Sequence, residues 1–260
     1  MSRRDMTLTT LTSEISNWPH AAKLAGALAT LARHSVSGGD TVDMLSRLAR
    51  QCVDVLPIAA AGILITDQFS ALKVIGSSSD AAHLLDLYQV QNEQGPCLEC
   101  LQSGKPVSLD DLSAPDAPWP HFRVAAVREG FSSVYALPLA AEDTVVGALN
   151  LFALHPLSEQ DLIGAQSLAD AATMTLLRAD PTEDGLVVAR RLHDAVETRN
   201  GVEQAKGMIA QRYDLDIAAA FQLLVDVADE SGKSVSEVAR YVTLRVSDPV
   251  LDTLFLRQRS

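Results

Sequence analysis

The spacing of apolar residues divides the first part of the chain into helices followed by a strand. From residue 21, two amphipathic helices are predicted on either side of a glycine pair at 38–39, and Asp40 is expected to cap the second. Pro57 ends the helical pattern. The continuous apolar run over residues 59–66 has the length and composition of a buried strand.

Short apolar runs then alternate with helical segments. Further strands are expected at 71–76, 105–109, 134–139 and 144–152, and further helices at 80–91, 121–129 and 158–178. Polar turns at Asp67-Gln68 and Glu142-Asp143 connect neighbouring strands. Strand pairs with short turns, separated by helices, predict a mainly antiparallel sheet with helices packed on it.

A second domain is predicted after Pro181, which disfavours continuation of the preceding helix. Helical periodicity begins near Leu186, Asp216 is expected to cap a second helix, and Ser234 with Glu237 forms a capping box for a third. The fold class is therefore α+β, a sheet domain followed by an all-α domain. The expected divisions are a flexible tail at 1–20, the sheet domain at 21–179, a linker at 180–185, the helical domain at 186–246 and a tail at 247–260.

Composition and charge narrow the function. Of 260 residues, 47% are apolar, which excludes global disorder, and the net charge is −12. Residues 1–185 hold 11 basic and 22 acidic side chains, whereas residues 186–246 hold 8 and 9. Because phosphate contacts need Lys and Arg, only the helical domain could present a nucleic-acid surface.

A cytoplasmic protein without a membrane segment is expected. No apolar stretch follows the first arginines, so a secretory signal is not predicted. The longest apolar run, residues 57–65, is too short to span a bilayer. Three cysteines do not make a disulfide framework.

One segment of the predicted long helix carries a specific motif. It reads Glu203-Gln204-Ala205-Lys206-Gly207, and further apolar and capping residues follow at Ala220-Phe221, Leu223-Leu224, Ala228 and 236–239. Residues 186–246 thereby resemble the ANTAR family, three-helix domains that bind RNA and relieve transcription termination. The resemblance implies a homodimer that binds an RNA with two small hairpin loops, whose splayed bases suit sequence-specific recognition.

The residue types of this motif allow two interpretations. Gly207 costs about 1 kcal/mol relative to Ala inside a helix, which suggests a close approach by a ligand backbone or by another helix. Lys206 can supply charge to a phosphate, or it can simply be solvated while Ala205 and Gly207 pack. With the resemblance, the expected RNA contacts are Gln204, Ala205, Lys206, Gly207, Arg212 and Lys233.

The sequence also departs from the ANTAR pattern. Val225 and Asp226 stand where family members usually carry basic residues, Lys233 is followed by Ser234, and Asp229 adds negative charge. An alternative is therefore a protein–protein signalling module in which RNA binding has weakened.

A second set of motifs lies in the sheet domain. Gln94 to Glu99, Gly104 to Val107, Pro118 to Phe122, Gly130 to Leu139 and Gly147 to Leu151 follow one another in order. Residues 21–179 thereby resemble actinobacterial GAF domains, sensory modules with a pocket on one face of an antiparallel sheet. The resemblance implies an unknown small-molecule or protein signal. No motif indicates a cofactor, and His83 and His121 are isolated.

The pair Cys97 and Cys100 allows a third hypothesis. Pro96 suits the first position of a helix, which places Cys97 in a first turn where the helix dipole lowers a thiol pKa. The two thiols would share a face, so a redox switch is conceivable. The alternative is two small buried hydrophobic side chains. A zinc site would need two further ligands.

No catalysis is expected, because no nucleophile elbow, phosphate loop or carboxylate pair stands out. Ser77 to Asp80 is expected to be a turn and helix cap. A dimer seam is predicted along the long helix, and the linker with Gly185 is the expected hinge. The seam residues are Val188, Leu192, Ala195, Val202 and Ile209.

Overall fold

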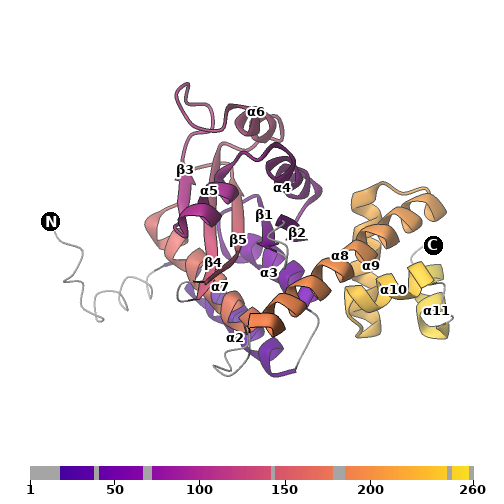
Figure 1. Ribbon diagram of the computed structural model, residues 1–260. Helices are drawn as coiled ribbons and strands as arrows, with labels where there is room; N and C mark the ends of the chain where they lie inside the picture. Colours follow the sequence, from indigo (N-terminus) through magenta and orange to yellow (C-terminus); the bar gives the residue numbers. More distant parts are fainter. Residues whose placement is uncertain are drawn as a thin grey trace.

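The protein forms two lobes joined by one long helix (Figure 1). The computed structural model describes residues 18–37, 41–66, 72–141, 144–177, 185–244 and 248–257. The predicted turns at 67–68 and 142–143, the cap at Asp40 and the linker at 180–184 lie outside these residues. The α+β fold class is confirmed, and each strand predicted from the sequence is present.

The first lobe is built on a five-stranded antiparallel sheet in the order β2-β1-β5-β4-β3. The strands are β1 (Ala60–Thr66), β2 (Leu72–Ser77), β3 (Val107–Leu109), β4 (Ser133–Ala141) and β5 (Thr144–Ala153). The central pairs set the register, with Leu64 opposite Ala148 and Leu137 opposite Leu149. Since side chains alternate between faces, each strand contributes to two separate cores.

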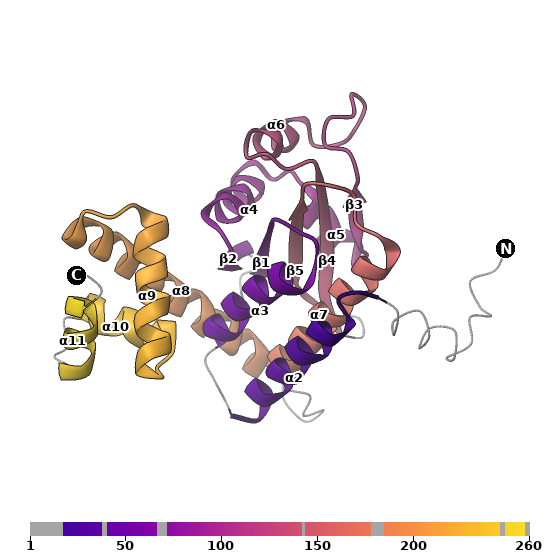
Figure 2. The same ribbon diagram turned by 180° about the vertical axis from the view of Figure 1, so that it is seen from behind.

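One face of the sheet is covered by α2 (Ala21–Ser37), α3 (Thr41–Val55) and α7 (Glu159–Leu177) (Figure 2). The core on this side includes Ile63, Leu149 and Leu151 from the strands. Trp18 belongs to the same core, and its Nε1 donates to Asp161 Oδ1 at 2.9 Å. The flexible tail predicted for 1–20 is therefore wrong at residues 18–20, because the indole packs against α7.

The opposite face is covered by α4 (Asp80–Asn92), α5 (Pro96–Ser103) and α6 (Pro120–Arg128). Leu64, Ala148 and Phe152 face these helices. Helix α4 begins as predicted, because Ser79 is its N-cap and the Ser79 hydroxyl accepts from the Ala82 amide at 3.2 Å.

The second lobe consists of α8 (Gly185–Tyr213), α9 (Ile217–Ser231), α10 (Val235–Leu244) and α11 (Pro249–Arg257). Asp216 caps α9, and Ser234 and Glu237 form the predicted capping box of α10. The core of the lobe comes from these four helices alone. The prediction of a tail at 247–260 is corrected here, because α11 places Leu251 and Phe255 in that core.

Helix α8 also packs against the first lobe. It contacts α3 and β2, and α10 contacts α3. The second lobe therefore lies against the edge of the sheet formed by β2 and against the adjoining start of α4 (Figure 1).

Candidate functional site

The motif identified in the sequence lies on the part of α8 between the two lobes. Ala205 is fully buried in the core of the second lobe. Lys206 points toward the first lobe and is only 3% exposed, whereas Gln204 and Gly207 face away and are exposed. Four adjacent motif residues on one helical turn therefore face three environments: the core of the second lobe, the contact with the first lobe, and solvent.

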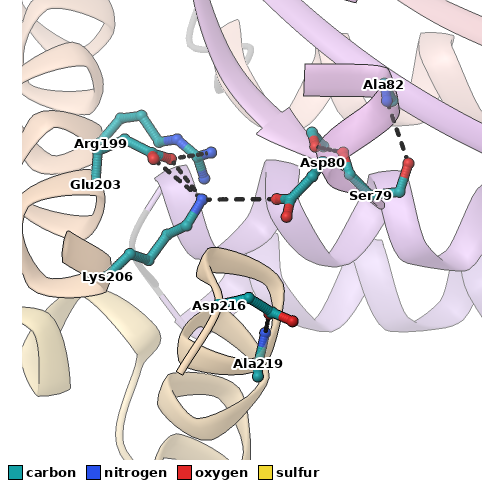
Figure 3. Close-up of polar contacts among 9 residues, drawn as sticks. Ser79, Asp80, Ala82, Arg199, Glu203, Lys206, Asp216 and Ala219 are labelled. Carbon is teal, nitrogen blue, oxygen red and sulfur yellow. Dashed lines mark hydrogen bonds and ion pairs between the residues drawn. The ribbon is translucent and has the colours of Figure 1, made fainter. Parts of the chain in front are cut away.

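The side chain of Lys206 ends in a cluster of charges between α8 and α4 (Figure 3). Its Nζ lies 3.0 Å from Glu203 Oε2 and 4.0 Å from Asp80 Oδ1. The Phe221 ring, 5.2 Å away, covers the same amine. Arg199, 5% exposed, pairs with the other oxygen of Glu203. The cluster contains two cations from α8, a bridging carboxylate and one carboxylate of the first lobe.

Burial and neighbouring charges shift the pKa values in this cluster. Burial alone would raise the pKa of Glu203, but the cations of Arg199 and Lys206 outweigh it and lower the pKa. Burial lowers the pKa of Arg199. Burial, with Arg199 and Lys206 nearby, also lowers the pKa of His83, one turn along α4 from Asp80. The cluster thus favours the ionised form of Glu203 and disfavours protonation of His83, which would add a third cation.

A second polar contact joins the lobes on the other side of α8. Arg47 of α3 lies 3.5 Å from Asp229 of α9 and also pairs with Asp43 at 2.8 Å. Asp229 was expected to weaken RNA binding as a free negative charge. In the structure its charge is directed at the first lobe.

The basic patch expected from Lys206, Arg212 and Lys233 is not formed in this arrangement. Lys206 is buried against Asp80, and Lys233 pairs with Asp248 at 3.6 Å. Arg212 is exposed, with its guanidinium 5.6 Å from the Tyr213 ring centroid. The sequence could not show this for Lys206 and Lys233, because tertiary packing brings Asp80 and Asp248 to them.

Between the exposed Glu197 and Asp214, the open side of α8 is polar and uncharged. Asn200, Gln204, Gly207 and Gln211 are exposed and recur at spacings of three and four residues, which places them on one face of the helix. A Cβ added to Gly207 would meet nothing within 4 Å, so none of the described helices packs there. Sequence analysis missed Asn200 and Gln211, although helical spacing from Gln204 would have found them.

The sheet domain contains a buried polar group on the face covered by α4 and α5. Asp86 is fully buried, and its Oδ1 accepts from Asn150 at 2.7 Å and from Gln89 at 3.3 Å. Gln89 in turn accepts from the Cys97 amide at 3.0 Å. Burial raises the pKa of Asp86 to about 8, although both hydrogen bonds oppose the shift. Gly62 lies directly against this carboxyl, because any side chain there would overlap it.

The redox hypothesis for Cys97 and Cys100 is not supported. Both thiols are free, fully buried and part of an apolar cluster between α5 and the sheet. Burial raises the pKa of Cys97 well above its usual range and that of Cys100 to about 12. The expected lowering by the helix dipole is therefore outweighed by desolvation, and the thiolate needed for exchange is disfavoured.

Two further features were searched for over the part of the chain that the structure describes. None of these helices is long and apolar enough to cross a bilayer. Within the same residues, no group of three or more His, Cys, Asp or Glu side chains is arranged to hold a metal ion.

Comparison with known proteins connects these features to two domain families. The model of the GAF domain matches residues 39–176, and the model of the ANTAR domain matches residues 190–242. A search of the curated proteins found no match.

Several solved structures are similar to the sheet domain. One is the GAF domain of a phosphoenolpyruvate-protein phosphotransferase from Coxiella burnetii, at 16% identity over 61% of this chain and 95% of that one, with a TM-score of 0.47. Another is a GAF domain/HD domain protein from Geobacter sulfurreducens, at 18% identity over 55% and 95%, with a TM-score of 0.45. A third is free methionine-R-sulfoxide reductase from Neisseria meningitidis, at 16% identity over 66% and 91%, with a TM-score of 0.45.

The fold and the family matches define a regulatory protein with a sensory domain and a helical output domain. The chain belongs to the GAF domain family and carries an ANTAR domain after the GAF domain. It therefore combines a signal-sensing module with the domain of RNA-binding antitermination regulators.

Proposed function

We propose that this protein is a signal-responsive antitermination regulator whose ANTAR domain binds an RNA with two hairpin loops. The observation that carries the proposal is the ANTAR match over residues 190–242, together with the open polar face of α8 within it. Binding would favour the two-loop structure over a competing terminator, so that the polymerase reads on.

The open face of α8 suits contact with unpaired bases. The amides of Asn200, Gln204 and Gln211 each offer a donor and an acceptor, which match the edges of splayed bases. Gly207 leaves room for a base or sugar to approach the helix backbone. Arg212, Lys206 and Lys233 supply charge for phosphates. This division between base contacts and phosphate contacts is usual in nucleic-acid recognition.

The alternative of a protein–protein module loses two of its three supports, Val225 and Asp229, and keeps Asp226. Val225 is buried in the core of the ANTAR domain, so an apolar residue there is explained by packing. Asp229 contacts Arg47 of the GAF domain. Neither residue has to represent a lost RNA contact.

A homodimer remains part of the proposal, but its seam must differ from the predicted one. Val202 and Ile209 are buried in the core of their own ANTAR domain and cannot face a second copy. The side chains of Val188, Leu192 and Ala195 lie outside the described residues. These three positions of the predicted seam stay part of the proposal.

Fluorescence anisotropy with a two-hairpin-loop RNA, measured over a salt series, tests this function. We expect Arg212→Gln to weaken binding and to reduce the slope of log K against log salt by about one, because one phosphate contact is lost. Arg128→Gln removes an equally exposed arginine from α6 of the GAF domain and is expected to change neither quantity. Equal effects of the two variants would contradict a specific ANTAR surface.

A further inference from the structure

We propose that the structure is a closed state in which the GAF domain withholds Lys206 from RNA through Asp80. This inference rests on the function proposed above and assigns its regulation. The amine of Lys206 is 3% exposed and lies among Glu203, Asp80 and the Phe221 ring. A phosphate oxygen would have to take the place that the carboxylate of Asp80 occupies.

RNA and the GAF domain therefore compete for the same cation. Glu203 belongs to the same helix as Lys206 and accompanies it in any state, whereas Asp80 belongs to the other domain. The amine has three donors, but two carboxylates already lie beside it, Glu203 at 3.0 Å and Asp80 at 4.0 Å, so a phosphate that approached from the side of Asp80 would meet that second negative charge. Binding of RNA through Lys206 requires that α8 and α4 separate.

The contacts that hold the closed state are weak enough to be released. Asp80 is 4.0 Å from Lys206 with a side chain 40% exposed, and Arg47 is 3.5 Å from an Asp229 that is 59% exposed. In each pair the carboxylate is open to solvent, which screens the pair and limits its contribution. The apolar core of the ANTAR domain contains no residue of the GAF domain, so separation leaves that core intact. A ligand with a modest preference for the open state could therefore shift the equilibrium.

Helix α4 links the sensory core to this contact. Its first residue is Asp80, and less than two turns later Asp86 is hydrogen-bonded to Asn150 of the sheet. A change in the buried group around Asp86 that displaces α4 would also displace Asp80. The same helix thus connects the inside of the GAF domain with the amine of the ANTAR domain.

Amine acylation read by mass spectrometry tests the closed state directly in the full chain. Lys206 is expected to be acylated at least about tenfold more slowly than the exposed Lys105, in proportion to the small open population. Asp80→Asn is expected to accelerate acylation of Lys206 and to tighten binding of a two-hairpin-loop RNA by about three- to tenfold. Asp116→Asn removes an exposed charge from the loop before α6 and controls for net charge.

A second variant separates opening from simple electrostatics. Arg47→Gln breaks the contact with Asp229 while making the chain more negative. A charge effect alone would weaken RNA binding in this variant, whereas opening would strengthen it. We expect stronger binding and faster acylation of Lys206. Far-UV circular dichroism verifies that both variants are folded.

Two results would overturn the closed state. One is acylation of Lys206 as fast as that of Lys105 in the unmodified chain. The other is faster acylation of Lys206 in both variants while their RNA affinity stays unchanged. If that affinity still depends on Arg212, the proposed function survives. Absence of RNA binding in every variant, including those with accessible Lys206, would remove the proposed function and this inference together.

Discussion

At the scale of single residues, the two domains show different solutions to a buried charge. The buried amine of Lys206 is surrounded by the carboxylates of Glu203 and Asp80. Among the residues that the structure describes, no cation lies within hydrogen-bonding distance of Asp86, and only the amides of Asn150 and Gln89 donate to its Oδ1. Since an unpaired buried carboxylate is costly, Asp86 favours its neutral form.

Asp86→Asn is expected to stabilise the GAF domain at pH 8. The pKa of Asp86 is about 8 in the folded protein and 3.8 in its unperturbed state, so between these values the folded state holds a proton that the unfolded state has released. Stability is therefore fully present below pH 3.8 and is lost as pH rises toward 8. Asparagine keeps the acceptor and removes the ionisation, which should add several kcal/mol at pH 8, because one pKa unit corresponds to about 1.4 kcal/mol.

Urea unfolding from pH 4 to pH 8 measures this effect. The advantage of Asp86→Asn should shrink toward pH 4, where both side chains are neutral. Asp116→Asn, in an exposed loop, is the control and should show no pH-dependent gain. An advantage of Asp86→Asn that is constant with pH would show that the carboxyl at position 86 does not titrate abnormally.

At the scale of elements, local sequence signals predict those helices and strands whose formation depends on interactions between residues close in sequence. Apolar period and caps such as Ser79 and Ser234 were sufficient to place the strands and most helices. Helix α11 was not predicted, although the sequence contains a signal for its start. The carboxylate of Asp248 accepts from the amides of Val250 and Leu251, and Pro249 takes the first helical position. A nine-residue helix is unstable alone, so its formation depends on packing that the sequence does not display.

Phe255 is expected to be the residue by which α11 completes the ANTAR core. Its ring is 5% exposed and stacks with Tyr213 at 6.4 Å and with Tyr241 at 6.0 Å. Phe255→Ala should destabilise the ANTAR domain by about 3 kcal/mol through lost burial and a cavity. Val250→Ala, on the exposed side of α11 with 57% exposure, should cost less than about 0.5 kcal/mol.

Thermal unfolding followed by circular dichroism compares these two α11 variants. If α11 is a dispensable tail, Phe255→Ala and Val250→Ala will unfold at the same temperature. A large difference between them assigns α11 to the folded unit and extends the ANTAR domain beyond the boundary at 246 that the motif alone suggests.

At the scale of the whole molecule, the sequence predicted the two domains but not the relation between them. The motif around Lys206 could be located from its spacing, and the family resemblance implied its role. That Lys206 is directed at Asp80, 126 positions earlier, depends on how α8 lies against α4 and β2. No local pattern encodes such a contact. The predicted dimer seam is wrong at Val202 and Ile209 for the same reason, since both side chains pack within their own domain.

The closed state is expected to open as pH falls, with His83 as the sensitive group. Arg199, Lys206, Glu203 and Asp80 face its ring, and burial followed by the Arg199 charge lowers its pKa below 6.5. In the open state the ring regains water and loses both cations, so its pKa returns toward 6.5. A proton therefore binds the open state better, and the closed state is stable above pH 6.5 and weakens as pH falls through this value.

Acylation of Lys206 relative to Lys105, measured from pH 7.5 to pH 5.5, would report this opening, because the ratio cancels the intrinsic pH dependence of amine reactivity. We expect the ratio to rise severalfold toward pH 5.5, as one pKa unit corresponds to about a tenfold change in the equilibrium. His83→Gln should flatten the profile, whereas His121→Gln, an exposed position at the start of α6, should leave it unchanged. A rise that persists in His83→Gln would assign the pH response to another group. If the rise is lost in His83→Gln, proton binding and the release of Lys206 from Asp80 occur at one interface, because His83 and Asp80 lie on the same turn of α4.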